Sequence, residues 1–286
     1  MAERRWIGVV DRAYGVVEHA WEHPATQRRL ATAIILLFLG SLLVIELALR
    51  GIVPLHVRSH FTAVDLVFTS LLFIEVLGLV FGLVGSIANA MGKQLEILSL
   101  IMLRQAFKRF AYFDEPLHWN QVQESVLYIL SDAGGALLLF VVLGVYYRAQ
   151  RHNPITADPQ AKASFIAIKK VVALGLVLVF AGIGAVDLHH LATGQGTYPF
   201  FDTFYTVLVF ADVLIVLVSL RYATDYAVVF RNSGFALATV LIRLALTAPP
   251  LLDVALGMAA ATLALGLTWA YNRFRISPEP ESHGPA

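Results

Sequence analysis

The sequence contains no cysteine and few charged residues. Of its 286 residues, only 14% are Asp, Glu, Lys or Arg. The absence of thiols excludes disulfide bonds, thiolate metal ligands, cysteine-ligated clusters and cysteine nucleophiles. A soluble globular domain is usually about 25% charged, so this low charge is typical of a membrane protein. The net charge of +1 provides no basic surface for nucleic acid, and we expect no nucleic-acid partner.

The common sequence signatures of catalysis are also missing. The chain has no HExxH zinc motif, Walker A loop, GxGxxG fingerprint or GxSxG nucleophile elbow. Its histidines fall at span ends, in loops or in the N-terminal segment, and not at facing mid-span positions where a b-type haem would be held. We therefore expect no enzyme activity, no metal and no other cofactor.

Long apolar runs dominate the chain. Hydrophobic residues make up 58% of it, and the mean hydropathy is +0.72. A membrane-spanning helix needs about 20 mostly apolar residues, which predicts an all-α integral membrane protein with eight spans. These lie at 30–50, 64–85, 95–112, 125–147, 170–190, 203–221, 234–249 and 251–271. The third is the least secure, because Lys108 and Arg109 crowd its end.

The ends of the chain lack long apolar runs. Apolar residues recur every three or four positions near the N-terminus, at Trp6, Val10, Ala13, Val17 and Trp21. This spacing predicts an amphipathic helix over 3–22 that lies in the membrane interface and ends before Pro24. The alternative is a soluble helix packed on the membrane domain. Residues 1–29 are therefore treated as a separate segment, and 276–286 as a disordered tail.

The distribution of basic residues predicts an orientation. With eight spans and an inner N-terminus, the 21 Lys and Arg residues concentrate in inner segments. The exceptions are Arg104 and Arg243 within spans, and Arg50, Arg58, Lys108 and Arg109 in outer segments. This asymmetry follows the positive-inside rule, so we expect both termini in the cytoplasm.

The second half of the sequence repeats the first. DLVFTSLLFIEVLGLVFGL from Asp65 aligns without a gap with DTFYTVLVFADVLIVLVSL from Asp202. We expect two four-span repeats, 30–147 and 165–275, joined by a polar linker at 148–164. Because four spans return the chain to the same side, the repeats should be parallel, related by an axis along the membrane normal.

Charged residues within the spans recur with the repeat. Glu75 and Asp212 lie halfway along the second span of each repeat, and Arg104 and Arg243 halfway along the third. A charge at membrane depth costs about 2.5–3.5 kcal/mol or more, so we expect acid–arginine pairs at similar depth. Pairing within each repeat and across the repeats are both allowed. The pairs could fix helix register, or they could line a polar pathway for a proton or small anion.

A second group of charged residues lies near the outer side. It comprises Glu46, Asp65, Asp187, His189, His190, Asp202 and Asp253, with Asp132 nearby. Asp65, Asp202 and Asp253 lie near helix starts, where N-capping is the simplest role. Glu46 and Asp187 lie near helix ends, where the helix dipole disfavours an acid, so each should have a partner. The spacing matches no defined metal motif.

The second half carries an acid in span two, a basic residue opening span three, Arg243, and a Pro-x-x-Asp turn at Pro250–Asp253. The last span then ends in Trp269 and an Asn-Arg. In these features the second half resembles the phosphate-starvation-inducible E (PsiE) family of small four-span membrane proteins. The first half has lost this turn. The resemblance implies a bacterial inner-membrane helix bundle, here duplicated in tandem, and no particular biochemical activity.

Two functions follow as hypotheses. One is permeation or transport of a small ion, a proton or oxyanion, through the acid–arginine pairs. The other is a non-transporting scaffold or regulatory subunit in which the pairs only fix helix packing. The basic inner face suits a membrane-protein partner or anionic lipid of the surrounding bilayer.

Overall fold

The computed structural model describes residues 2–54, 57, 59–113, 115–150, 159–193, 196, 198–222 and 225–274. Within these ranges the protein is helical, with no strand. The helices are α1 (Ala2–Glu22), α2 (Pro24–Leu49), α3 (Thr62–Gly82), α4 (Ile87–Lys108), the 3-10 helix η1 (Arg109–Tyr112), α5 (Trp119–Ala149), α6 (Pro159–Thr193), α7 (Phe200–Leu220), α8 (Tyr226–Thr247) and α9 (Leu252–Phe274). The tail expected at 276–286 lies outside these residues, as does much of the expected linker.

Several helices begin earlier in the chain than the apolar runs indicated. The third and seventh expected spans begin at Ile87 and Tyr226, because polar side chains cap them: the Ser86 hydroxyl accepts from the Asn89 amide at 3.1 Å, and the Asp225 carboxylate from the Ala227 amide at 3.1 Å. Likewise, α2 includes residues 24–29 and α6 includes residues 159–164, which the sequence had left outside the spans.

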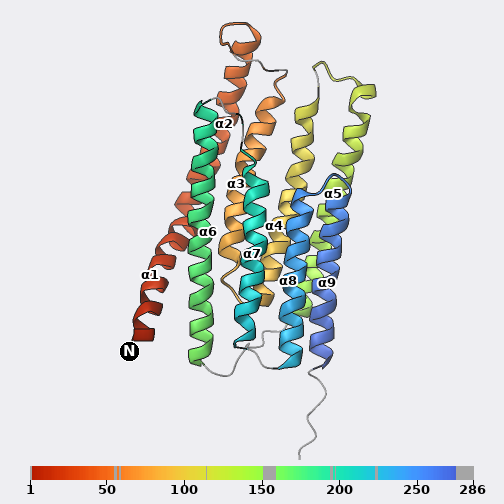
Figure 1. Cartoon of the computed structure of the whole chain (residues 1–286). Coiled ribbons are helices and arrows are strands. Elements are labelled where there is room, and N and C mark those ends of the chain that lie inside the picture. Colours follow the sequence, from red (N-terminus) through yellow and green to blue (C-terminus); the bar gives the residue numbers. More distant parts are fainter. Residues whose placement is uncertain are drawn as a thin grey trace, which may run out of the picture.

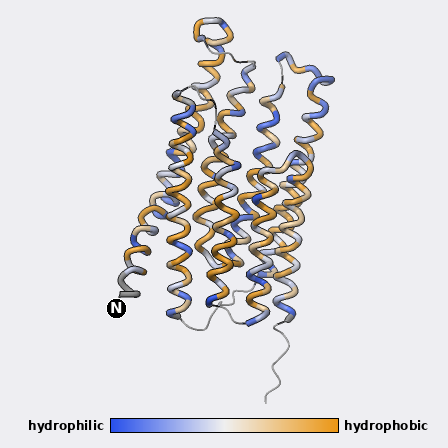
Figure 2. Tube along the Cα trace, in the orientation of Figure 1, coloured by the Kyte–Doolittle hydropathy of each residue, from blue (hydrophilic) through white to orange (hydrophobic). Residues whose placement is uncertain are grey.

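Seven helices, α2, α3 and α5 to α9, are long and apolar enough to cross a membrane. They form a polytopic bundle in which hydrophobic residues cover most of the helix lengths and hydrophilic ones gather toward the ends (Figure 2). The exception is α4, which carries Lys93, Glu96, Arg104 and Lys108. Its place is nevertheless inside the bundle, because it packs against α3, α5 and α8.

Helix α1 leads into α2 in the same direction, and the helices from α2 to α9 then run alternately up and down the bundle (Figure 1). We call the end where α1 begins and α9 ends the lower end, following Figure 1. Helix α5 packs against both α4 and α9, and α4 packs against α8, so the two halves of the chain meet along these helices. The turn between α8 and α9 reaches only part of the way up α5 (Figure 1).

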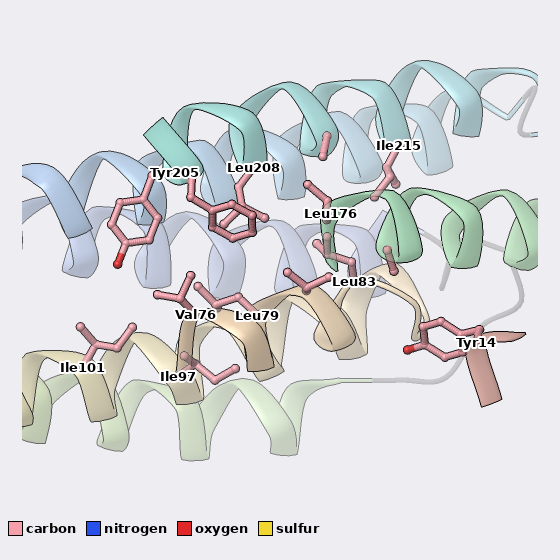
Figure 3. Packing of buried hydrophobic residues seen from close by; sticks show 14 of the residues in the cluster. Tyr14, Val76, Leu79, Leu83, Ile97, Ile101, Leu176, Tyr205, Leu208 and Ile215 are labelled. Atoms are coloured by element: carbon pink, nitrogen blue, oxygen red, sulfur yellow. The ribbon is translucent and has the colours of Figure 1, made fainter. Parts of the chain in front are cut away.

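Two hydrophobic clusters hold the bundle together, and each draws on both halves of the chain. The first joins α3 and α4 to α6 and α7 through residues such as Leu79, Ile101, Leu176 and Leu208 (Figure 3). The second joins α4 and α5 to α8 and α9, where the small residues of α9 allow close packing: Ala260, Ala261 and Ala264. The halves therefore share their cores.

Helix α1 packs against the lower part of the bundle, chiefly on α6. Tyr14 is buried in the first cluster, and the Trp21 ring stacks on Phe81 of α3 at 5.6 Å. Asp11 forms an ion pair with Lys170 of α6 at 2.9 Å. These contacts match the alternative reading, a helix packed on the membrane domain. Val9 and Val16 remain exposed.

Candidate functional site

The first acid–arginine pair joins α3 to α4. An Nη1 atom of Arg104 lies 2.6 Å from Oε1 of Glu75. The Glu75 side chain is 7% exposed, whereas 31% of the Arg104 side chain remains exposed. This pair therefore lies at the edge of the bundle on its arginine side.

The second pair joins α7 to α8 and is buried on both sides. The Nε atom of Arg243 lies 3.3 Å from Oδ2 of Asp212, with side-chain exposures of 1% and 4%. Among the described residues, no side-chain nitrogen of Arg243 has a well-aligned hydrogen-bond acceptor. A guanidinium carries five N–H donors. Arg243 is therefore held by its charge, and its donors have no well-aligned acceptor among the described residues.

Both pairs form within one half of the chain, between the second and third helix of that half. Of the two pairings that the sequence allowed, the structure contains the one within each half.

A cavity of about 40 Å³, with mainly apolar walls and several polar side chains, adjoins the second pair. Its polar lining comes from four helices: Gln94 of α4, Lys169 of α6, Asp212 of α7, and Asn232 and Thr239 of α8. Both side-chain polar atoms of Gln94 lack a hydrogen-bond partner among the described residues, and so does Nδ2 of Asn232. Buried polar groups are nearly always hydrogen-bonded to protein or water, so these atoms indicate that the cavity holds a polar occupant.

Lys169 is the most unusual residue of this lining. Its residue exposure is 2%, and its ammonium donates to the carbonyl oxygen of Gly85 in the α3–α4 turn and lies 5.6 Å from the Phe165 ring centre. No carboxylate among the described residues lies within ion-pair distance of it. Its neighbour Lys170 instead pairs with Asp11.

The expected outer group of acids and histidines is divided among separate partners. Glu46, near the end of α2, pairs with Arg50 at 2.5 Å and with Nε2 of His60 at 3.0 Å. The other ring nitrogen of His60 lies 2.9 Å from Glu115. Hydrogen bonds to Glu115 and Glu46 favour the protonated ring and so raise the pKa of His60. Glu46 thus has the partner that its place near a helix end required.

Asp187 also has a partner, of a different kind. Its carboxylate accepts from the backbone amide of Tyr198 at 2.8 Å, which ties the end of α6 to the start of α7. The His190 ring lies edge-on to Tyr198. His189 contributes its backbone carbonyl to Thr193. In the part of the chain that is described, no three His, Asp or Glu side chains are close enough to share a metal ion.

The expectation that Asp65 and Asp202 cap helices is wrong. The caps of α3 and α7 are Phe61 and Pro199, neither of which makes a side-chain cap hydrogen bond. Both acids lie after the cap residue, in the first turn of the helix. A negative charge there still interacts favourably with the helix dipole. Asp65 additionally lies 3.4 Å from Lys108.

Asp253 lies in the first turn of α9 and accepts from the Val254 amide at 2.7 Å. It is buried close to Asp132 of α5, which is fully buried and lies 3.5 Å from Arg109. Asp132 has no counterpart in the second half, and its partner is Arg109 of the 3-10 helix η1.

The sequence analysis missed the cavity and four of its five polar residues: Gln94, Lys169, Asn232 and Thr239. Gln94 and Asn232 carry no charge, so nothing in their apolar surroundings set them apart. Lys169 was assigned to an inner segment with Lys170. The one available signal was the run Ile166–Val171, in which helical geometry turns two adjacent lysines to different sides.

These features define a polytopic helical protein of the membrane class, with ion pairs in its interior and a cavity that several polar side chains help to line. Comparisons of the chain with protein-family models, curated proteins and solved structures found no match. The resemblance to the PsiE family therefore stays a prediction from the residues quoted for it.

Proposed function

We propose that the protein conducts or transports a small ion, in the first instance protons, across a bacterial inner membrane through the Asp212–Arg243 site. The observation that carries the proposal is the cavity beside this buried pair. Charged residues within membrane segments commonly mark ion and proton pathways. An acid that is 4% exposed, and that borders a cavity with unmatched polar atoms, is suited to exchange a proton with trapped water.

The size of the cavity favours protons over oxyanions. One water occupies about 30 Å³ in the liquid, so about 40 Å³ accommodates one or two waters. A tetrahedral oxyanion such as phosphate needs room for four oxygens as well as donors on all sides. Arg243, which would be its natural ligand, lies behind Asp212 and does not line the cavity.

We also propose eight spans arranged as two parallel four-helix repeats. The packing of α4 supports a spanning role for it, since a helix covered by α3, α5 and α8 has little need of an apolar surface. Contacts between equivalent helices, α4 with α8 and α5 with α9, support an axis along the membrane normal.

A cytoplasmic lower end is part of the same proposal. Basic residues concentrate at this end, among them Arg12, Lys93, Lys162, Lys170, Arg221 and Arg273. Among the described residues, the upper end has fewer, such as Arg50, Lys108 and Arg109. The positive-inside rule then places the lower end in the cytoplasm. In the cytoplasm, the basic lower end is available to a membrane-protein partner or to anionic lipid. An inner-membrane location is also what membership of the PsiE family would imply.

The test is proton flux into liposomes that contain the purified protein and a trapped pH-sensitive dye. A potassium gradient with valinomycin supplies the driving potential. We expect flux with the native chain and with Glu75→Leu/Arg104→Met, and none with Asp212→Leu/Arg243→Met. If the second double variant does not fold, Asp212→Asn replaces it. Absence of flux from the native chain, or unchanged flux in a folded Asp212 variant, refutes the proposal.

A scaffold function is favoured by a different observation. Helix α2 buries only 6% of its most apolar stretch, leaving Ile35, Leu36, Leu39 and Leu43 exposed. The Glu75–Arg104 pair does not line the cavity beside Asp212, and it acts as a direct clamp between α3 and α4. A bundle without flux, whose α2 can be crosslinked to another membrane protein, would support this function instead.

A further inference from the structure

The cavity beside Asp212 contains an imbalance of charge. Arg243 and Asp212 neutralise each other across 3.3 Å. The remaining charge is that of Lys169, which is 2% exposed and has only a carbonyl and an aromatic ring as neighbours of its ammonium. Leaving a buried charge without a counterion is strongly destabilising. A bound anion would remove this cost.

The donors around the cavity converge from three helices. Lys169 of α6 supplies an ammonium, and Gln94 of α4 and Asn232 of α8 supply amide groups. The Gln94 side chain is 1% exposed, as is Asn232, and their Nε2 and Nδ2 atoms have no acceptor within the described ranges. An ammonium together with unused amide donors is the arrangement that an anion requires.

The rest of the lining selects the kind of anion. Leu83, Ile87, Met91 and Phe235 form apolar walls, and the volume of about 40 Å³ exceeds that of a single water only slightly. Apolar walls disfavour strongly hydrated ions, and the volume is too small for a tetrahedral oxyanion. Asp212 also borders the cavity, but Arg243 offsets its charge.

We infer that this cavity is a binding site for one halide-sized monovalent anion, of the chloride class, held by Lys169, Gln94 and Asn232. The site lies next to the proposed proton pathway but does not depend on flux. Its role is to complete the charge balance of the bundle interior, so occupancy should stabilise the folded protein.

The experiment is thermal unfolding of the full chain, purified in detergent with gluconate as the only anion. Chloride, bromide, sulfate or phosphate is then added at matched ionic strength. We expect chloride and bromide to raise the unfolding midpoint with a saturable dependence on concentration. Sulfate and phosphate should not. Equal effects of all four anions would indicate ionic strength alone and would overturn the site.

Variants locate the anion. Lys169→Met should weaken the chloride dependence by about tenfold or more, since a charge-assisted hydrogen bond is lost. Lys170→Met is the matched control, because Lys170 pairs with Asp11 away from the cavity lining, and it should keep the dependence. If Lys169→Met does not fold, Gln94→Leu serves. An unchanged chloride response in a folded cavity variant refutes the site.

The outcomes separate this inference from the proposed function. Saturable chloride stabilisation without proton flux retains the anion site and removes the transport proposal. Proton flux without a chloride-specific shift does the opposite.

Discussion

The two acid–arginine pairs occupy equivalent places in the two halves of the chain but have different surroundings. Arg104 remains 31% exposed and meets Glu75 at 2.6 Å, whereas Arg243 is 1% exposed and meets Asp212 at 3.3 Å. The cavity that Lys169, Gln94 and Asn232 help to line adjoins the second of these pairs. The comparison shows that the same charge pattern can act as a clamp at the edge of a bundle and as a candidate site at its centre.

The position of each half in the bundle explains this difference. Helix α3 packs against the peripheral α2, and Arg104 of α4 keeps 31% of its side chain exposed at the bundle surface. Helix α7 packs against α6, and helix α8 packs against α4 of the other half. Polar side chains from all four of these helices line the cavity.

The largest expected effect is the loss of Arg243. Arg243→Met leaves Asp212 buried without a counterion, which should lower the free energy of unfolding by about 3–5 kcal/mol. Arg104→Met should cost clearly less, because the arginine side of that pair is already 31% exposed. Denaturant titration in detergent micelles measures both values.

A double variant provides the control for this prediction. Asp212→Leu/Arg243→Met replaces the pair by apolar groups and should recover most of the lost stability. Equal losses for Arg104→Met and Arg243→Met would show that the two pairs do not differ in the way that their burial indicates.

A smaller effect is expected where the two halves meet along α5 and α9. A Cβ atom on Gly135 would lie 2.6 Å from a methyl group of Val254, whereas one on Gly134 would meet nothing within 4 Å. Gly135→Ala should therefore destabilise the protein by about 1–3 kcal/mol through overpacking.

Gly134→Ala is the matched control in the same helix turn. It should be neutral, or stabilise by up to about 1 kcal/mol through helix propensity. The two alanine variants are compared by the same denaturant titration. Equal stabilities for them would mean that α9 does not approach α5 closely at this level, and that the halves are joined mainly through α4 and α8.

The sequence sufficed for features set by spacing along one helix or between neighbours. The Glu75–Arg104 ion pair was predicted from the position of each residue along its expected span, although Arg104 lies near the end of α4 and not halfway along it. The length of the apolar runs likewise predicted most of the helices. Their true starts depended on local caps, such as Ser86 and Asp225.

Features that depend on packing between the halves could not be predicted in this way. Gln94 and Asn232 lie on different helices of different halves, and only the contact of α4 with α8 brings them to one cavity. Glu115, which completes the contacts of His60, lies 55 positions away in the sequence, in a connection with no distinctive pattern.

The smallest expected effect concerns the upper ends of the two halves, which differ in their response to pH. In the first half, His60 contacts Glu46 at 3.0 Å and Glu115 at 2.9 Å, and the pKa of His60 is raised. In the second half, Asp187 accepts from a backbone amide, which does not titrate. Only the first connection should therefore loosen near neutral pH.

The sign of the effect follows from the raised pKa of His60. The carboxylates of Glu46 and Glu115 contact the protonated ring in the folded protein and not in the unfolded one. The stabilisation of the folded protein by these contacts is therefore complete below the ordinary histidine pKa of about 6.5. It is lost as the pH rises through the raised value in the folded state. Hydrogen exchange of the amides of residues 59–61 should accelerate over this pH range in the native chain, beyond the intrinsic pH dependence of exchange. In His60→Gln this additional change should disappear, whereas Asp187→Asn should leave it intact. If the change persists in His60→Gln, the connection at the upper end of the first half is held by contacts other than this histidine.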